Sequence, residues 1–188
     1  MRTAFPSFPS PRFTSGRCLA GALVFSLSLA AAAPPVSDSA EMQREALHKL
    51  AFLVGRWSGP VTIMRGPGEL LHLTQSEEVQ YKLDGLVLLI EGKSTSTDGK
   101  AQFSALATIS FDDATQAYRI RAYNDGHCLD AELSVLGDGF SWSFPAGPAR
   151  IVNTMHLTGK GEWQEVTEAT VGNAAPRRNV EMLLQHLP

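Results

Sequence analysis

Cysteine is scarce in this chain, and its scarcity limits what can hold the fold together. The 188 residues include two cysteines, and Cys18 lies in an N-terminal segment that we expect to be removed. A single remaining cysteine cannot form an intramolecular disulfide, so a hydrophobic core must stabilise the fold. We expect Cys128 to be a small, half-buried strand residue, with a reactive thiol as the alternative. His127 beside it would point to the opposite face of a strand, so the two cannot easily share a metal ion.

An excess of basic residues is also missing. The leader holds three arginines and no acidic residue; without it, 13 basic residues stand against 19 acidic ones, a formal net charge of −6. That charge argues against nucleic acid or an anionic membrane as a partner. About 155 residues would remain, which suits one domain that buries close to 70% of its unfolded surface.

Long apolar runs are absent except near the N-terminus. A basic stretch over residues 1–17 precedes the apolar residues 18–30, and the segment ends in Ala31-Ala32-Ala33. This order is typical of an export signal, and the run is too short for a spanning helix, which needs about 20 apolar residues. A membrane anchor or an unstructured leader are the alternatives. We predict a signal peptide over residues 1–33, no stable membrane insertion after cleavage, and a periplasmic or secreted protein.

The remaining chain begins with one predicted helix. Residues 34–39 form a linker, and Asp38 with Glu41 resembles a capping box at a helix start. Apolar residues then recur at helical spacing over about a dozen residues, at Met42, Ala46, Leu50 and Leu53. We expect Gly55 to end this helix, because a residue just past a helix end often takes a positive φ. Trp57 would then open the first strand, near the base of a barrel.

Turn signals divide the rest of the chain at nearly regular intervals. The nine turns are Gly66-Pro67-Gly68, Asp84-Gly85, Asp98-Gly99, Asp112-Asp113, Asn124-Asp125-Gly126, Gly137-Asp138-Gly139, Pro145-Ala146-Gly147-Pro148, Gly159-Lys160-Gly161 and 172–176. They predict about ten strands with no intervening helix, and Asp-Gly pairs are strong hairpin signals. The predicted fold over residues 40–188 is therefore an all-β, antiparallel, up-and-down barrel with one helix at its base.

Alternation along the strands predicts a hollow interior. Phe140, Trp142 and Phe144 share one face of their strand. Small residues share the inward face of other strands, namely Ala105, Ala107, Ala122 and Ala131. Small side chains at the centre leave a ten-stranded barrel underfilled, and an underfilled barrel is a ligand cavity.

Some inward positions are polar. On the same alternation the interior receives Gln75, Glu77, Asn153, Glu165 and Thr167. Buried polar groups require partners, so they either satisfy one another or bind a ligand. The two inward carboxylates could also act as an acid–base pair. The third possibility is a β-bulge that moves Glu77 or Glu165 to the surface and brings Glu78 or Glu168 inside.

Two arginines on one predicted strand have two possible roles. Arg119 and Arg121 alternate with inward residues and could pair across strands with Asp130 and Glu132. We favour an exposed charge ladder over a substrate clamp.

Several motifs together resemble a known group of proteins. They are Leu53-Val54-Gly55-Arg56-Trp57-Ser58-Gly59, Glu77-Glu78-Val79-Gln80-Tyr81 with Asp84-Gly85, Tyr118-Arg119-Ile120-Arg121-Ala122-Tyr123, Trp163-Gln164-Glu165-Val166-Thr167-Glu168 and Glu181-Met182-Leu183. The first resembles the opening motif of calycin-type barrels, the lipocalin and nitrobindin relatives. The set, in this order from about Leu50 to Leu187, resembles the bacterial domain-of-unknown-function family numbered fifteen seventy-nine. The resemblance implies a lipocalin-like barrel and transfers no activity.

The chain departs from the haem-binding nitrobindin branch. Val61 stands where the opening motif of that branch has its third glycine, and Arg177-Arg178-Asn179 stands where it sets its iron-ligating histidine. His186 is inward in phase but lies near the chain end, where fraying would hold an axial ligand poorly. We therefore expect no cofactor.

These observations predict an exported barrel that binds a small, largely apolar molecule. The candidate ligand-binding residues are Trp57, Gln75, Glu77, Trp142, Asn153, Trp163 and Glu165. The alternatives are an enzyme of the barrel interior, haem-dependent or using Glu77 and Glu165 as acid and base, and a protein-interaction module with a filled core. Catalytic and metal-binding residues are not assigned.

Export can be tested on the protein itself. We expect the exported form to begin near Ala33 or Pro34, because the Ala-x-Ala end of the leader is the cleavage signal. N-terminal sequencing of the extracytoplasmic fraction checks this. An intact Met1 in that fraction would contradict the prediction.

Overall fold

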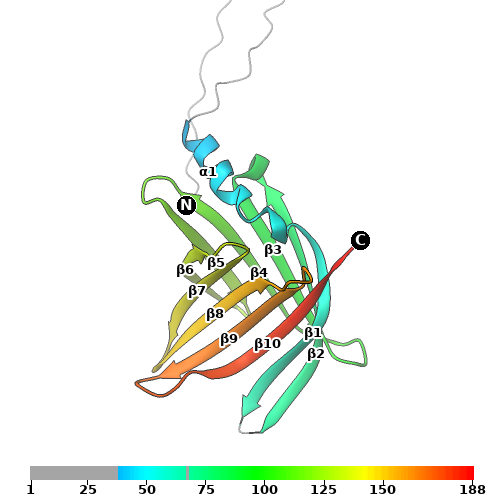
Figure 1. Ribbon diagram of the computed structural model, residues 1–188. Coiled ribbons are helices and arrows are strands. Elements are labelled where there is room, and N and C mark those ends of the chain that lie inside the picture. The colour runs from blue at the N-terminus through cyan, green and yellow to red at the C-terminus, as the bar shows by residue number, and fades with distance from the viewer. Residues whose placement is uncertain (1–37, 67) are drawn as a thin grey trace, which may run out of the picture. The chain divides into compact units, whose positions relative to one another are not determined.

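Ten strands of the described chain close into an antiparallel barrel (Figure 1). The computed structural model describes residues 38–66 and 68–188; the predicted signal peptide and residues 34–37 of the predicted linker lie outside them. The elements are α1 (Asp38–His48), the short 3₁₀ helix η1 (Ala51–Leu53), β1 (Gly55–Gly66), β2 (Glu69–Lys82), η2 (Leu83–Gly85), β3 (Val87–Thr95), β4 (Ala101–Asp112), β5 (Ala117–Asn124), β6 (His127–Val135), β7 (Gly139–Ala146), β8 (Ala149–Leu157), β9 (Trp163–Val171) and β10 (Arg177–Leu187).

The topology is up-and-down, as the turn signals predict. Each strand pairs with the next along the chain, and β1 closes the barrel by pairing with β10, for example Val61 with Met182. Closure matters because it leaves no sheet edge exposed to other chains. No helix in the described ranges has the length and hydropathy needed to cross a membrane.

The predicted helix begins at Asp38 as expected, but its end was predicted wrongly. α1 stops at His48, and η1 follows it before the first strand. Gly55 is therefore not the helix stop; it is the first residue of β1, with a φ of 131°. Residues with a Cβ rarely adopt this positive φ, and a Cβ here would also meet the His186 ring, so the position favours glycine.

A closing segment, residues 47–53 at the end of α1 and in η1, covers one end of the barrel (Figure 1). Leu47, Leu50 and Leu53 have no exposed surface. Two strand tyrosines bind the end of α1: the Tyr81 hydroxyl donates to the Leu47 carbonyl at 3.2 Å, and the Tyr118 hydroxyl donates to the Ala46 carbonyl at 2.8 Å. Each of these carbonyls also accepts a backbone N–H, from Lys49 to Ala46 and from Leu50 to Leu47, so the tyrosines are second donors that tie the end of α1 to β2 and β5. Met42, one of the predicted apolar positions, is 41% exposed because it lies on the turn of α1 farther from this segment.

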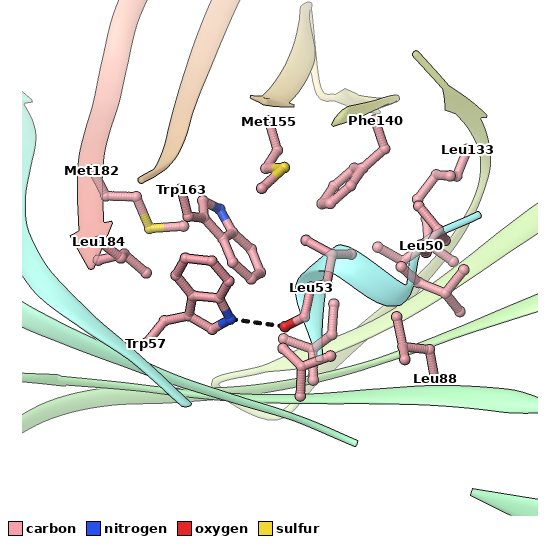
Figure 2. Packing of buried hydrophobic residues seen from close by; sticks show 14 of the residues in the cluster. Leu50, Leu53, Trp57, Leu88, Leu133, Phe140, Met155, Trp163, Met182 and Leu184 are labelled. Atoms are coloured by element: carbon pink, nitrogen blue, oxygen red, sulfur yellow. Dashed lines mark hydrogen bonds between the residues drawn. The ribbon is translucent and has the colours of Figure 1, made fainter. Parts of the chain in front are cut away.

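Trp57 lies at the junction between η1 and the strands, as predicted. It is 3% exposed, and its indole Nε1 donates to the Leu53 carbonyl at 2.8 Å (Figure 2). Its ring meets the Trp163 ring edge to face, with centroids 5.7 Å apart. Trp57 therefore joins the closing segment to the core at the base of the barrel.

The alternation of inward and outward residues is also confirmed. The β1–β2 register is unbroken from Gly55 opposite Val79 to Met64 opposite Leu70, so no bulge displaces Glu77. The irregularity between β9 and β10 falls at Arg178, beyond Glu165. Both glutamates face inward, and the bulge alternative does not apply.

The arginine pairs form the expected ladder on the outer face. The Arg121 guanidinium binds both carboxylate oxygens of Asp130, at 2.6 and 2.8 Å, and Arg119 lies 3.8 Å from Glu132. All four side chains are about half exposed or more. Exposed pairs contribute about 0–1 kcal/mol each, so the ladder favours the β5–β6 register without dominating stability.

The β6–β7 pair has the shortest strand ladder in the described barrel. It joins through three residue pairs, Leu133–Trp142, Ser134–Ser141 and Val135–Phe140. The first residues of β6 therefore lack ladder partners on the β7 side. Cys128, expected to be half-buried, is exposed, because it is the second residue of β6, beside the turn at the barrel rim.

Replacement of Trp57 tests the base of the barrel. We expect Trp57→Ala to lower the free energy of unfolding by roughly 3–5 kcal/mol, because it removes a large buried side chain and its hydrogen bond. Urea denaturation followed by circular dichroism measures the change. Leu70→Ala on β2, where the side chain is 53% exposed, is the control and should stay within about 0.5 kcal/mol. An unchanged midpoint and slope for Trp57→Ala would contradict this account.

Candidate functional site

The interior holds a cavity of about 350 Å³ between the core at the barrel base and the β5–β6 turn at the opposite rim. One wall is aromatic, formed by Phe140, Trp142, Phe144 and Trp163. The Trp142 and Phe144 rings stack, with centroids 5.3 Å apart. The facing wall is made of small residues, namely Gly92, Ala105, Ala107 and Ala122. The expectation of an underfilled interior is therefore confirmed, with the difference that Ala131 packs against the core and does not line the cavity.

Two carboxyl groups border this cavity, Glu77 from β2 and Glu165 from β9. Both side chains are half-buried, and the surface that remains open belongs to the cavity. Desolvation raises the pKa of Glu77 from 4.5 to about 7, opposed by a hydrogen bond from Gln75 and assisted by the charge of Glu165. Desolvation likewise raises the pKa of Glu165 to about 7, opposed by a hydrogen bond from Trp163. The effect of burial on each pKa exceeds the opposing effect of the single hydrogen bond, because each carboxylate has lost most of its hydration.

A chain of hydrogen bonds fixes Glu77. The Ser94 hydroxyl donates to Gln75 Oε1, and Gln75 Nε2 donates to Glu77 Oε1 at 2.6 Å. An ionised carboxylate only accepts hydrogen bonds, so the amide nitrogen of Gln75 faces Glu77, and the amide oxygen accepts from the Ser94 hydroxyl. Gly92 lies opposite Glu77 on β3, and a Cβ there would lie 2.7 Å from Glu77 Oε2. The carboxyl group of Glu77 therefore occupies the space that a side chain at Gly92 would fill.

The other polar residues are paired on β8 and β9. Trp163 Nε1 donates to Glu165 Oε2 at 3.0 Å, and the Thr167 hydroxyl donates to Asn153 Oδ1 at 2.7 Å. Across the described chain, no buried side-chain nitrogen or oxygen lacks a partner. The inward polar residues thus make most of their hydrogen bonds with one another and still border the cavity.

Five of the seven predicted residues line the cavity together: Glu77, Trp142, Asn153, Trp163 and Glu165. Gln75 lies behind Glu77 and positions it. Trp57 does not border the cavity, because its ring fills the base between Leu53 and Trp163.

Sequence reasoning missed several residues of the site. Gly92 and Ser94 lie on the inward face of β3, in phase with the buried Leu88 and Ile90. The period-two pattern of that strand carried this signal. His127 and Asn124 line the cavity at its rim, beside a turn where alternation gives no reliable face.

The described histidines, cysteine and carboxyl groups do not form a metal or haem site. In residues 38–66 and 68–188, no group of three His, Cys, Asp or Glu residues could hold a metal ion. His186, the inward candidate for haem, lies edge-on to the Trp57 ring with centroids 4.7 Å apart and does not line the cavity. His127 lines it at the rim. This placement does not fit an axial ligand held at the cavity centre.

Comparison with known proteins supports the fold alone. No family model matches the chain, and no curated protein matches it, so membership of family fifteen seventy-nine finds no support. The crystal structure of Rv2717c from M. tuberculosis is similar, with a TM-score of 0.57 and 13% sequence identity, over 76% of this chain and 98% of that chain. At this identity the likeness fits a calycin-like barrel and carries no activity.

The two carboxyl groups should make stability depend on pH. Their folded pKa values, about 7, exceed the value of 4.5 expected in the unfolded chain. Between about pH 4.5 and 7 the folded state therefore binds more protons, and the free energy of unfolding falls as pH rises. Each pKa is raised by about 2.5, and a difference of one corresponds to about 1.4 kcal/mol, so we expect the two groups together to change the free energy of unfolding by several kcal/mol.

Urea denaturation at intervals across this range measures the effect. The double variant Glu77→Gln/Glu165→Gln should lose that part of the slope, whereas Glu168→Gln, which does not line the cavity, should keep it. Asp98, Asp112 and Asp130, whose pKa values are lowered from 3.8 by hydrogen bonds, act below this range. An identical slope in the double variant would rule out desolvation of the pair.

Proposed function

We propose that this protein is exported and binds a small, largely apolar molecule inside its barrel. The observation that supports this best is the cavity of about 350 Å³, because its volume lies in the range of small-molecule pockets and its wall is mostly aromatic and aliphatic. A cavity of this size is not filled by the side chains around it, which argues against the interaction module with a filled core.

The lining supplies affinity and orientation separately. The rings of Phe140, Trp142, Phe144 and Trp163 offer apolar contact area at little conformational cost. A few polar groups in an apolar pocket fix the orientation of a ligand. Glu77, Glu165 and Asn153 have this position, so a ligand with one polar end and an apolar body suits the cavity best.

Export is supported by the leader pattern of residues 1–33. A periplasmic or secreted location follows from that pattern. The partner in this proposal is a small molecule, and nucleic acid is excluded from it on charge.

One observation favours an acid–base enzyme as the second candidate. Two carboxyl groups in one cavity have pKa values of about 7, near the value that suits general acid–base catalysis at neutral pH. We rank it second because structural burial alone also raises the pKa of carboxyl groups.

Binding can be measured with Nile red, a neutral dye whose emission depends on polarity. We expect saturable binding with a blue-shifted emission, and Trp142→Ala should weaken it by roughly tenfold because the ring provides much of the contact surface. Leu136→Ala, at a 53% exposed residue outside the cavity, should leave the affinity unchanged.

A filling variant separates the interior from the outer surface. Ala122 lines the cavity, and Ala122→Leu should reduce dye binding while the circular dichroism spectrum is retained. Dye affinity that is indifferent to both Trp142→Ala and Ala122→Leu would show that the dye binds elsewhere and that the cavity is not the site.

A further inference from the structure

The charges around the cavity are unbalanced. The ionisable residues that line it are Glu77 on β2, Tyr123 on β5, His127 and Cys128 on β6, and Glu165 on β9. No lysine or arginine is among the described residues of the lining. On the outer surface the pattern is the opposite, since Asp98, Asp130, Glu132 and Glu181 each lie against a lysine or an arginine. The fold thus pairs these surface carboxylates and leaves the two in the cavity without a counter-charge.

Each cavity carboxyl group has one oxygen engaged and one open. Gln75 donates to Glu77 Oε1, and Trp163 donates to Glu165 Oε2. Both donors are neutral, so they orient the groups without balancing their charge. The second oxygens make no hydrogen bond within the described chain, and no described side-chain oxygen is both buried and without a partner. Glu77 Oε2 and Glu165 Oε1 therefore lie at the cavity surface, available to a ligand.

We propose that the ligand carries a protonated amine on an apolar body, and that Glu77 and Glu165 bind the amine while the aromatic wall binds the body. This inference rests on the proposed function and names the ligand class. An ammonium group has donors only, and open carboxylate oxygens are acceptors, so the two match in hydrogen bonding as well as in charge.

The rest of the lining agrees with a cation. The Trp163 ring borders the same cavity as the carboxyl group it contacts, and the Trp142 ring faces the interior from β7. Aromatic faces attract ammonium groups by about 0.5–2 kcal/mol, more where water is excluded. A fatty-acid carboxylate would instead add a third negative charge to a desolvated site with no arginine or lysine, which is unfavourable.

Binding of an amine should also release protons. Without a ligand, burial keeps the two carboxyl groups partly protonated near neutral pH. An ammonium group beside them stabilises their ionised forms. The affinity for the amine should therefore rise with pH across about 5.5 to 8, and the calorimetric enthalpy should depend on the ionisation enthalpy of the buffer. His127 also lines the cavity at its rim, so its contribution must be separated from that of the two carboxyl groups by variants.

Three probes with one body test the ligand class: 4-phenylbutylamine, 4-phenylbutan-1-ol and 4-phenylbutanoate. Titration calorimetry on the purified protein at pH 8 should give the amine roughly tenfold tighter binding than the alcohol, the gain expected of one partly desolvated ion pair, with the carboxylate weakest. Lowering the pH to 5.5 should weaken the amine and leave the alcohol unchanged.

Variants then assign the preference to residues. Glu77→Gln/Glu165→Gln should bind amine and alcohol equally, because it removes both negative charges while each amide keeps the shape of the side chain. Glu168→Gln, on the same strand as Glu165 but outside the lining, and His127→Gln should retain the amine preference. If the double variant does not fold, the comparison of the three probes on the unaltered protein still decides the question.

The outcomes separate the two proposals. An alcohol that binds as tightly as the amine, or a carboxylate that binds more tightly, overturns the amine assignment and leaves the cavity as a binding site. A preference that persists in the folded double variant also overturns it. If none of the three probes binds and Nile red does not bind either, the proposed function itself fails.

Discussion

The burial of Trp57 against Leu53 is the contact on which the arrangement of the barrel depends. The barrel has to be closed at one end for its interior to be sheltered from water, and the closing segment is a short apolar stretch after α1. Its position is fixed by a 2.8 Å hydrogen bond from the Trp57 indole and by two tyrosine hydroxyls that donate to the end of α1. Because the indole belongs to β1, this contact ties the closing segment to the strand that completes the barrel with β10.

That closed base divides the interior into two parts. At the closed base, seven residues have no exposed surface and form a dense core: Leu47, Leu50, Leu53, Leu88, Ile109, Met155 and Leu184. Toward the opposite rim, alanines and a glycine stand in place of large residues, and the aromatic rings of β7 and β9 face the cavity. Large-to-small positions in a packed interior lower stability by the loss of contacts and the cavity that remains. The dense base offsets this loss, so one end of the barrel stabilises the fold while the other remains available for binding.

Much of this organisation is predictable from the sequence because β structure has a strict period. Gly-rich turns at regular spacing predict ten strands, and alternation places Glu77, Trp142, Asn153, Trp163 and Glu165 inward without reference to the structure. Local rules fail where tertiary contacts decide: the positive φ of Gly55 belongs to the start of β1, beside the His186 ring, and not to a helix end. The position of Trp57 outside the cavity depends on how far the closing segment reaches, which no periodicity encodes. The exposure of Cys128 depends on the short β5–β6 turn in the same way.

The cavity carboxyl groups oppose the fold that contains them. Burial raises the pKa of both, so ionisation of either group near neutral pH opposes folding. The surroundings nevertheless accommodate them in detail: the absence of a side chain at Gly92 leaves room for Glu77, the Gln75 amide donates to Glu77, and the Trp163 indole N–H donates to Glu165. A sequence selected for stability alone has no reason to keep such an arrangement. Groups that break local rules without a stabilising return are candidates for functional sites, and both of these border the same cavity.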